Sequence, residues 1–186
     1  PKYKLFFFYI RLTGQQWSAI YICNILKALK NNNLTYGIIT PYRSQERLIK
    51  AIIKDLEYSN IKDIKIATVH KFQGSESDVI IFDFVDSNPN KNLGKLLKGN
   101  NVSPTARLAN VSLSRAKGKF IAVGDLSYLK SKFETDDIFQ QIINEIENTG
   151  KIIKPLDLNK NISGSNDLKK IRKYSNCDEC LDDLIN

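Results

Sequence analysis

The sequence predicts a three-layer α/β domain in which a mostly parallel central sheet carries helices on both faces. Short β-rich runs alternate with segments whose apolar residues repeat at helical spacing, and this alternation is typical of parallel sheets. The run at residues 78–85 is almost continuously apolar, as expected of a strand covered on both faces. We therefore predict one domain over residues 1–150, followed at residues 151–186 by a partly ordered tail or the start of a truncated segment.

The first part of the chain predicts two strands, each followed by a helix. Residues 3–10 are a β-rich run, and the helix after it ends at the asparagines 31–33. Its buried face is predicted from apolar residues at helical spacing, namely Ala19, Ile22, Cys23, Leu26 and Leu29. Residues 36–40 form a short apolar strand that ends at Pro41. The second helix is predicted from a further set at the same spacing, namely Leu48, Ile49, Ile52, Ile53 and Leu56.

The middle of the chain predicts two more strands and a long loop. The strands cover residues 64–68 and 78–85, and residues 70–77 connect them as a loop. Residues 86–103 are rich in Asn, Lys and Gly and predict a second loop.

The last elements are predicted from capping signals. Ser103 and Pro104 suit the N-cap and first turn of a helix that runs to about Lys117, where Gly118 ends it before a strand at 119–123. A final helix is predicted with Thr135 as its cap, aspartates at 136 and 137 in its first turn, and an apolar face made of Ile138, Phe139, Ile142, Ile143 and Ile146.

Composition indicates a protein that folds in water and meets anionic partners. Hydrophobic residues make up 42% and charged residues 26%, and no apolar run approaches the roughly 20 residues that span a bilayer. The three cysteines, Cys23, Cys177 and Cys180, are unevenly spaced, which favours a reducing, intracellular compartment such as the cytoplasm, nucleus or nucleoid. The formal net charge of +8 fits a nucleic-acid partner, although a biased Lys- and Asn-rich composition accounts for it equally well. A chain that begins at Pro1 and lacks methionine suggests a piece of a longer protein.

The segment TVHKFQGSESDVII, residues 68–81, concentrates polar groups after a predicted strand and contains the only histidine of the chain. We expect the loop at 70–77 to lie at the carboxyl edge of the sheet, where open α/β sheets bind ligands. Its hydrogen-bonding side chains, its glycine and its carboxylate suit a phosphate backbone on one side and sugar hydroxyls on the other. These residues are Thr68, His70, Gln73, Gly74 and Glu76. The alternative is a histidine that is exposed to water or bonded within the protein.

Two further segments carry arginines near predicted helix ends. In residues 106–125, Arg107 and Arg115 lie eight residues apart, about 80° around a helix axis, so both can face one cleft and neutralise a phosphoryl group. A basic helix face in contact with water is the alternative. The segment PYRSQER, residues 41–47, opens a helix whose N-terminal amides can meet an anion.

Together these segments resemble a known set of helicase motifs. TPYRSQ (40–45) resembles motif IV, TVHKFQGSESDVII (68–81) motif V, and RLANVSLSRAKGKFIAVGD (107–125) motif VI of superfamily 1 helicases. The chain looks like the second, C-terminal RecA-like domain of superfamily 1B, the branch of the nonsense-mediated-decay and mu-switch-binding helicases. The resemblance implies a RecA-like, P-loop NTPase-like fold and covers residues 36–125 well.

The resemblance also implies roles for individual residues. ATP with Mg²⁺ would lie between two RecA-like domains, with the metal held mainly by the N-terminal one and Arg115 acting as the arginine finger. The implied ATP-binding residues are Gly74, Glu76, Arg115 and Arg43. The implied nucleic-acid-binding residues are Thr68, His70, Gln73, Gln45 and Tyr42, and the implied supporting residues are Arg107, Asn110 and Ser114.

The sequence departs from the family in two places. An Asn-x-x-Glu-Ala pattern is usual at the start of the first helix, and residues 15–19 read Gln-Gln-Trp-Ser-Ala instead. The 186 residues contain no GxxxxGK(S/T) motif, so we expect no ATP hydrolysis by this chain alone. The expected function is the C-terminal motor domain of an ATP-dependent DNA or RNA helicase, whose partners are a single strand and the N-terminal RecA-like domain of the same protein. The alternatives are a non-catalytic nucleic-acid- or partner-binding module derived from a helicase, and a different P-loop-like α/β domain.

Overall fold

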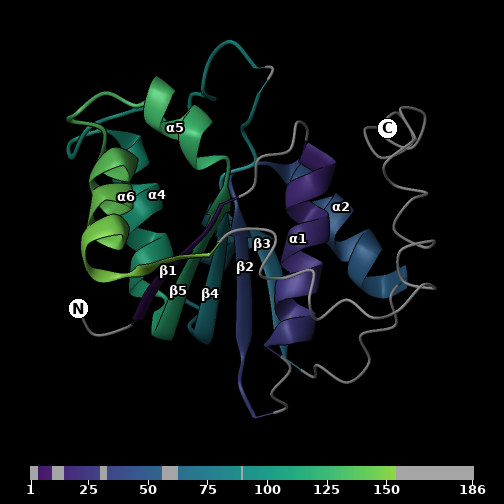
Figure 1. Cartoon of the computed structure of the whole chain (residues 1–186). Coiled ribbons are helices and arrows are strands. Elements are labelled where there is room, and N and C mark those ends of the chain that lie inside the picture. The colour runs from purple at the N-terminus through teal and green to yellow at the C-terminus, as the bar shows by residue number, and fades with distance from the viewer. Residues whose placement is uncertain (1–3, 10–14, 30–32, 56–62, 89, 154–186) are drawn as a thin grey trace.

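The computed structural model describes residues 4–9, 15–29, 33–55, 63–88 and 90–153 (Figure 1). The strands are β1 (Lys4–Tyr9), β2 (Tyr36–Thr40), β3 (Ile64–Thr68), β4 (Ser77–Asp83), β5 (Ala116–Gly124) and β6 (Lys151–Ile153). The helices are α1 (Gln15–Ala28), α2 (Arg43–Asp55), α3 (Val69–Phe72), α4 (Pro104–Ser114), α5 (Leu126–Lys132) and α6 (Ile138–Thr149). The strands form one six-stranded sheet in the order β3-β2-β4-β5-β1-β6, and every pair is parallel. The predicted α/β class is confirmed.

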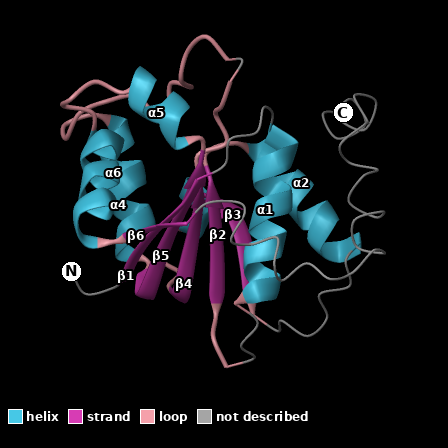
Figure 2. Ribbon diagram, in the orientation of Figure 1, coloured by secondary structure: helices cyan, strands magenta, loops and turns pink. Residues whose placement is uncertain are grey.

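Helices cover the sheet on both faces, as predicted (Figure 2). Side chains of successive strand residues point to opposite faces, so β4 contributes Val79 and Ile81 to one core and Ile80 and Phe82 to the other. The first core is closed by α1 and α2, and the second by α3, α4, α5 and α6. The second core contains a cluster of aromatic rings in which Phe82 stacks on Phe139 at a centroid distance of 5.2 Å. Because every strand pair is parallel, the carboxyl ends of the strands share one edge of the sheet, the carboxyl edge, and their amino ends share the other, the amino edge.

The region around Gly118 differs from the prediction. Helix α4 ends at Ser114 and β5 begins at Ala116, so Gly118 lies inside the strand and does not end the helix. The pairing of Ser77 with Ala116 extends β5 towards the amino edge. A Cβ at Gly118 would lie 3.2 Å from the carbonyl oxygen of Asp78, so a glycine suits the close approach of the two strands.

The two helices that follow β5 in the chain, α5 and α6, also depart from the prediction. Helix α5 was not expected; its N-cap Asp125 accepts a hydrogen bond from the Tyr128 amide, which stabilises so short a helix. The N-cap of α6 is Asp137 rather than Thr135. The Asp137 carboxylate accepts hydrogen bonds from the amides of Gly99 and Glu134, and these contacts fix the helix start two residues later than its local sequence suggests.

The sheet continues past the predicted domain limit at 150 through β6, whose 3 residues pair with β1. The predicted tail from residue 154 onward lies outside the described residues, together with Cys177, Cys180, Leu56 and the ends of the strand predicted at 3–10. Within the ranges described above, no helix is both long enough and apolar enough to cross a membrane.

Candidate functional site at the two edges of the sheet

The segment from Thr68 to Ser77 joins the two edges of the sheet. Thr68 pairs with Thr40 at the carboxyl ends of β3 and β2, whereas Ser77 begins β4 and donates its amide to the Arg115 carbonyl oxygen over 3.0 Å. Because β3 and β4 are parallel and separated by β2, the chain must return from one edge to the other. Our expectation that the whole loop 70–77 lies at the carboxyl edge is therefore wrong for its second half.

Helix α3 makes this return across the face of β2. Phe72 of α3 is fully buried and lies next to Gly37, the second residue of β2. A Cβ at Gly37 would lie 2.5 Å from Ile80 Cδ1 and closer still to the Phe72 ring, so only glycine leaves room for the helix. Lys65 lies 5.1 Å from the centroid of the Phe72 ring, and its ammonium donates to the Ser75 hydroxyl. The amino-edge end of the segment is thereby attached to β3.

The amino edge brings together Gly74, Glu76 and Arg115. Arg115 is the C-cap of α4; its Nε is buried and has no hydrogen-bond partner in the described part of the chain. Gly74 has a φ of 83°, and no atom lies within 4 Å of the position that a Cβ would take, so its backbone is open to a ligand. Glu76 is exposed, 4.0 Å from the Lys117 ammonium. A half-buried arginine, which stays charged, and an accessible glycine suit an anionic ligand.

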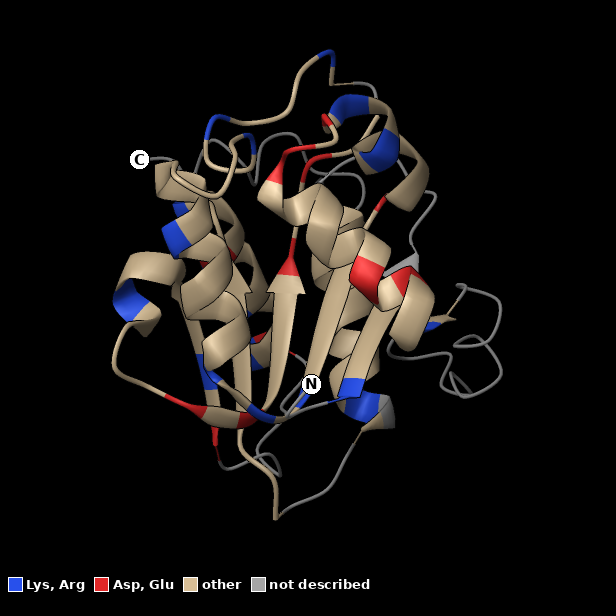
Figure 3. Cartoon of the chain, turned by 90° about the vertical axis from the view of Figure 1, so that its left-hand side faces the viewer, with Lys and Arg blue, Asp and Glu red and all other residues tan. Residues whose placement is uncertain are grey.

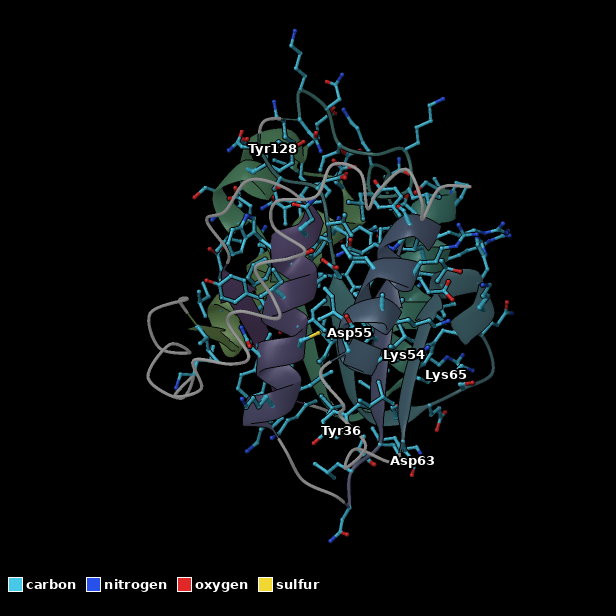
Figure 4. All side chains as sticks on the ribbon, turned by 90° about the vertical axis from the view of Figure 1, so that its right-hand side faces the viewer. Tyr36, Lys54, Asp55, Asp63, Lys65 and Tyr128 are labelled. Atoms are coloured by element: carbon cyan, nitrogen blue, oxygen red, sulfur yellow. The ribbon has the colours of Figure 1, made fainter. Side chains whose placement is uncertain are left out.

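A shallow cavity adjoins these residues on the same edge. Its lining includes Thr35, Asp63, Lys65 and Glu76. Figure 4 shows Tyr36 and Asp63 at this end of the sheet and Tyr128 at the other. Charged residues lie along both edges and not in the middle of the strands (Figure 3). The two edges therefore offer separate polar surfaces.

The carboxyl edge carries Tyr42, Arg43, Thr68 and His70, at the ends of β2 and β3. Arg43 and His70 are exposed, Tyr42 is half-buried, and Thr68 is buried. Arg43 thus lies at the opposite edge from Arg115, although both were assigned to one nucleotide. Gln73, which is exposed, lies on the turn that follows α3.

The predicted supporting residues lie on α4. Arg107 and Asn110 are exposed on this helix, and Ser114 is its last residue, with its hydroxyl donating to the Val111 carbonyl oxygen over 3.4 Å. Arg115 follows the last residue of α4 as its C-cap and keeps helical backbone angles, so the helix ends before Lys117, where we predicted its end.

Gln45 belongs to a buried network. It is only 1% exposed, and its amide nitrogen donates to Asp83 Oδ2 over 2.7 Å and to Ser18 Oγ over 2.9 Å. Ser18, on α1, in turn donates to Asp83 Oδ2 over 3.1 Å. The Val85 amide donates to Asp83 Oδ1 over 3.0 Å. In this arrangement Gln45 supports the carboxyl edge from within.

The backbone after Asp83 is strained. Val85 has a φ of 67°, which β-branched residues rarely adopt, and the Asp86 amide donates to the Phe84 carbonyl oxygen across it over 2.7 Å. This tight turn ends β4 at Asp83, two residues before the predicted end of the strand at Val85. Sequence reasoning missed Asp83, although a single carboxylate inside the apolar run 79–85 was a signal for it.

Burial raises the pKa of Asp83 to about 7, against the opposing effect of its hydrogen bonds to Gln45, Ser18 and Val85. A carboxyl whose folded pKa exceeds its unfolded value of about 3.9 binds more protons when folded, so its contribution to stability falls as the pH rises from about 4 to about 7. We expect the stability difference between wild type and Asp83→Asn to change with pH across this window. Urea unfolding at several pH values measures it, and a constant difference would contradict the buried titration.

Asp86 links Tyr42 to the loop at 86–103. Its carboxylate accepts hydrogen bonds from the Tyr42 hydroxyl, at 3.1 Å, and from the Gly94 amide, at 2.7 Å. Burial and the neighbouring Asp86 raise the pKa of Tyr42. The loop is thus attached to the start of α2, on the edge where the motif IV resemblance begins.

Replacing Gly94 by alanine is expected to weaken this attachment. The new Cβ would lie 2.9 Å from Tyr42 Cζ and closer to its hydroxyl, an overpacking that costs about 1–3 kcal/mol of unfolding free energy. The double variant Gly94→Ala/Tyr42→Phe, which removes the nearest atom, should recover part of the loss. Thermal unfolding measures both, and an unchanged midpoint for Gly94→Ala would show that the contact is not tight.

Comparison with known proteins now places the chain in a family. A family model described as an AAA domain matches residues 16–127, which is more than half of the chain. The chain belongs to the AAA domain family. This AAA domain has the RecA-like, P-loop NTPase-type fold, because its six-stranded parallel sheet carries helices on both faces.

Curated relatives of this AAA domain are helicases. It is 40% identical over 94 residues to the DNA replication ATP-dependent helicase/nuclease DNA2 of Mus musculus, covering 50% of the chain and 8% of the relative. It is 32% identical over 138 residues to an uncharacterized ATP-dependent helicase of Methanocaldococcus jannaschii, covering 72% and 18%, and 33% identical over 133 residues to helicase sen1 of Schizosaccharomyces pombe, covering 67% and 7%. The AAA domain is therefore related to superfamily 1 helicases and spans less than a fifth of the length of each of these three relatives.

Proposed function

We propose that this AAA domain is the second, C-terminal RecA-like domain of a superfamily 1B helicase and acts in an ATP-dependent motor. The observation that supports it most is the position of Arg115, whose buried Nε has no partner in the described part of the chain and which lies beside Gly74 and Glu76 at the amino edge. In the proposal, this edge faces a nucleotide held by the N-terminal RecA-like domain, and the carboxyl edge faces a single strand of DNA or RNA.

The residues of the amino edge fit a nucleoside triphosphate. The Arg115 guanidinium would stabilise the charge on the transferring phosphoryl group, because its fork reaches two oxygens and stays charged. Exposed Glu76 can accept hydrogen bonds from ribose hydroxyls, and Gly74 leaves space for the sugar. Mg²⁺, held mainly by the N-terminal domain, would neutralise phosphate charge. Arg43 lies at the other edge, so its assignment to the nucleotide has no support from the geometry.

The carboxyl edge suits a phosphate backbone. His70 and Arg43 are exposed at this edge, and the net charge of +8 supports an anionic partner. Thr68 begins the segment that carries Gly74 and Glu76, so strand contacts and nucleotide contacts belong to one short stretch of chain. This connection supports a motor in which strand binding stimulates hydrolysis.

A non-catalytic binding module is the second candidate, and one observation favours it. Ser18 lies in the segment 15–19, where the usual family pattern supplies a nucleotide contact. Here its hydroxyl donates a hydrogen bond to Asp83 in the interior of the protein. The module would hold nucleic acid at the same carboxyl edge with no effect of ATP.

One experiment separates the two candidates. ATP hydrolysis by the full-length protein is measured with and without a single-stranded oligonucleotide, and strand affinity is measured at several salt concentrations. The motor predicts hydrolysis that the strand stimulates. Strand binding that weakens with salt, together with hydrolysis that stays at background, would support the binding module and overturn the motor.

A further inference from the structure

A buried carboxylate on α2 contacts both ends of the junction between β3 and α3. The side chain of Glu46 is only 5% exposed. Its Oε2 accepts a hydrogen bond from the Thr68 amide over 3.3 Å, and its Oε1 lies 3.3 Å from the Lys71 ammonium. A third partner is Lys50, one turn along α2, whose ammonium lies 2.6 Å from Oε1. The side chain that directly follows the motif IV segment therefore contacts the motif V segment.

Glu46 stays ionised at neutral pH. Burial alone would raise the pKa of its carboxyl, but the hydrogen bonds and charges of Lys50 and Lys71 hold that pKa below its usual value. The three donors come from α2, from the end of β3 and from α3, and together they limit the orientations that the carboxylate can take.

Helix α3 depends on contacts of this kind for its position. It contains only 4 residues, and its N-cap Thr68 makes no side-chain capping bond. A helix of one turn is not stable alone, so packing must hold it. Val69 and Phe72 anchor the helix through the core, and Glu46 adds polar contacts to Thr68, which precedes the helix, and to Lys71 on its exposed side.

We propose that Glu46 is a positioning residue that fixes the end of α3 facing the nucleic acid. It thereby transmits the binding of a single strand of DNA or RNA to the Gly74–Glu76 segment at the amino edge. The proposal rests on the proposed function. Glu46 contacts neither the nucleic acid nor the nucleotide in this proposal, because its side chain is buried where α2 packs against the start of α3. When it holds α3, a displacement at His70 moves the helix as a unit and reaches Gly74 within one turn.

Three variants of the full-length protein test the proposal. Glu46→Ala removes all three contacts, whereas Glu46→Gln keeps an oxygen for the Thr68 amide and loses both ion pairs. Lys50→Gln is the matched control, because it removes one partner of Glu46 without touching α3. For each, the rate of ATP hydrolysis is measured with and without a saturating single strand, together with the strand concentration that gives half of the stimulation.

We expect Glu46→Ala to lower the ratio of stimulated to basal rate by about threefold to thirtyfold, the range that residues coupling two sites give. Glu46→Gln should lower it less. Lys50→Gln should stay within about twofold of wild type, because Lys50 is half-exposed and belongs to α2, so its loss leaves the contacts of Glu46 with Thr68 and Lys71 in place. The basal rate should not change in any of them. A wild-type ratio in a folded Glu46→Ala protein would overturn the proposal, and if that variant does not fold, a wild-type ratio in Glu46→Gln would overturn it.

Amide hydrogen exchange distinguishes failure of this inference from failure of the proposed function. If the wild-type protein shows no strand-stimulated hydrolysis, the motor is wrong. The positioning of α3 is then decided by exchange at residues 69–72. Faster exchange in Glu46→Gln than in Lys50→Gln would support the role of Glu46 in holding the helix, and equal exchange would overturn it.

Discussion

Replacing Arg115 by alanine in the full-length protein is expected to lower strand-stimulated ATP hydrolysis by about 10³- to 10⁵-fold, the effect of removing an arginine finger from a phosphoryl-transfer site. The reason is electrostatic: the charge that develops on the transferring group would lose its partner, while the strand-facing edge would be unchanged. Single-strand affinity should therefore remain close to wild type. Steady-state hydrolysis and fluorescence anisotropy measure the two quantities.

Two further variants make this result specific. Arg115→Lys keeps the positive charge and loses the fork, so its hydrolysis should remain far below wild type. Lys151→Ala removes an exposed charge on β6, at the far end of the sheet from β3, and should hydrolyse ATP normally. Because Arg115 caps α4 through its backbone, circular dichroism must show that each variant is folded. Undiminished turnover in a folded Arg115→Ala protein would rule out the finger.

Replacing Phe72 by alanine is expected to destabilise the domain by about 3–5 kcal/mol, since large aromatic side chains removed from a core leave a cavity that closes only in part. Phe72 is fully buried and lies against Gly37, whose missing side chain makes room for it. Urea unfolding of the domain measures the loss. Phe72→Leu keeps most of the apolar volume and should cost clearly less. A loss for Phe72→Ala no larger than that of Phe72→Leu would show that α3 is loosely packed.

The sequence predicts the fold class and most of its elements because their patterns are local. A strand buried on both faces has to be apolar at every position, as residues 79–82 are, and a helix that covers one face repeats its apolar residues at helical spacing. Gly118 was misjudged for a related reason. Glycine after a helix is a common end signal, but here strand pairing with β4 decides its conformation.

The path of the motif V segment could not be predicted from local signals. The direction of the chain after Thr68 depends on β2 lying between β3 and β4, which is a property of the whole sheet. The same holds for the contact of Glu46 with Thr68 and that of Asp83 with Gln45, because each joins elements distant in sequence. The motif residues were found because the resemblance depends on residue types and spacing, but their division between two edges needed the structure.

Photo-crosslinking tests the separation of the two edges most directly. A photoreactive residue is placed at His70 or at Glu76 in the full-length protein, and each variant is irradiated with a labelled single strand and, separately, with labelled ATP. We expect position 70 to capture the nucleic-acid strand and not ATP, and position 76 to capture ATP and not the nucleic-acid strand. Capture of the strand at position 76, or of ATP at position 70, would contradict the assignment of the carboxyl edge to nucleic acid and of the amino edge to the nucleotide.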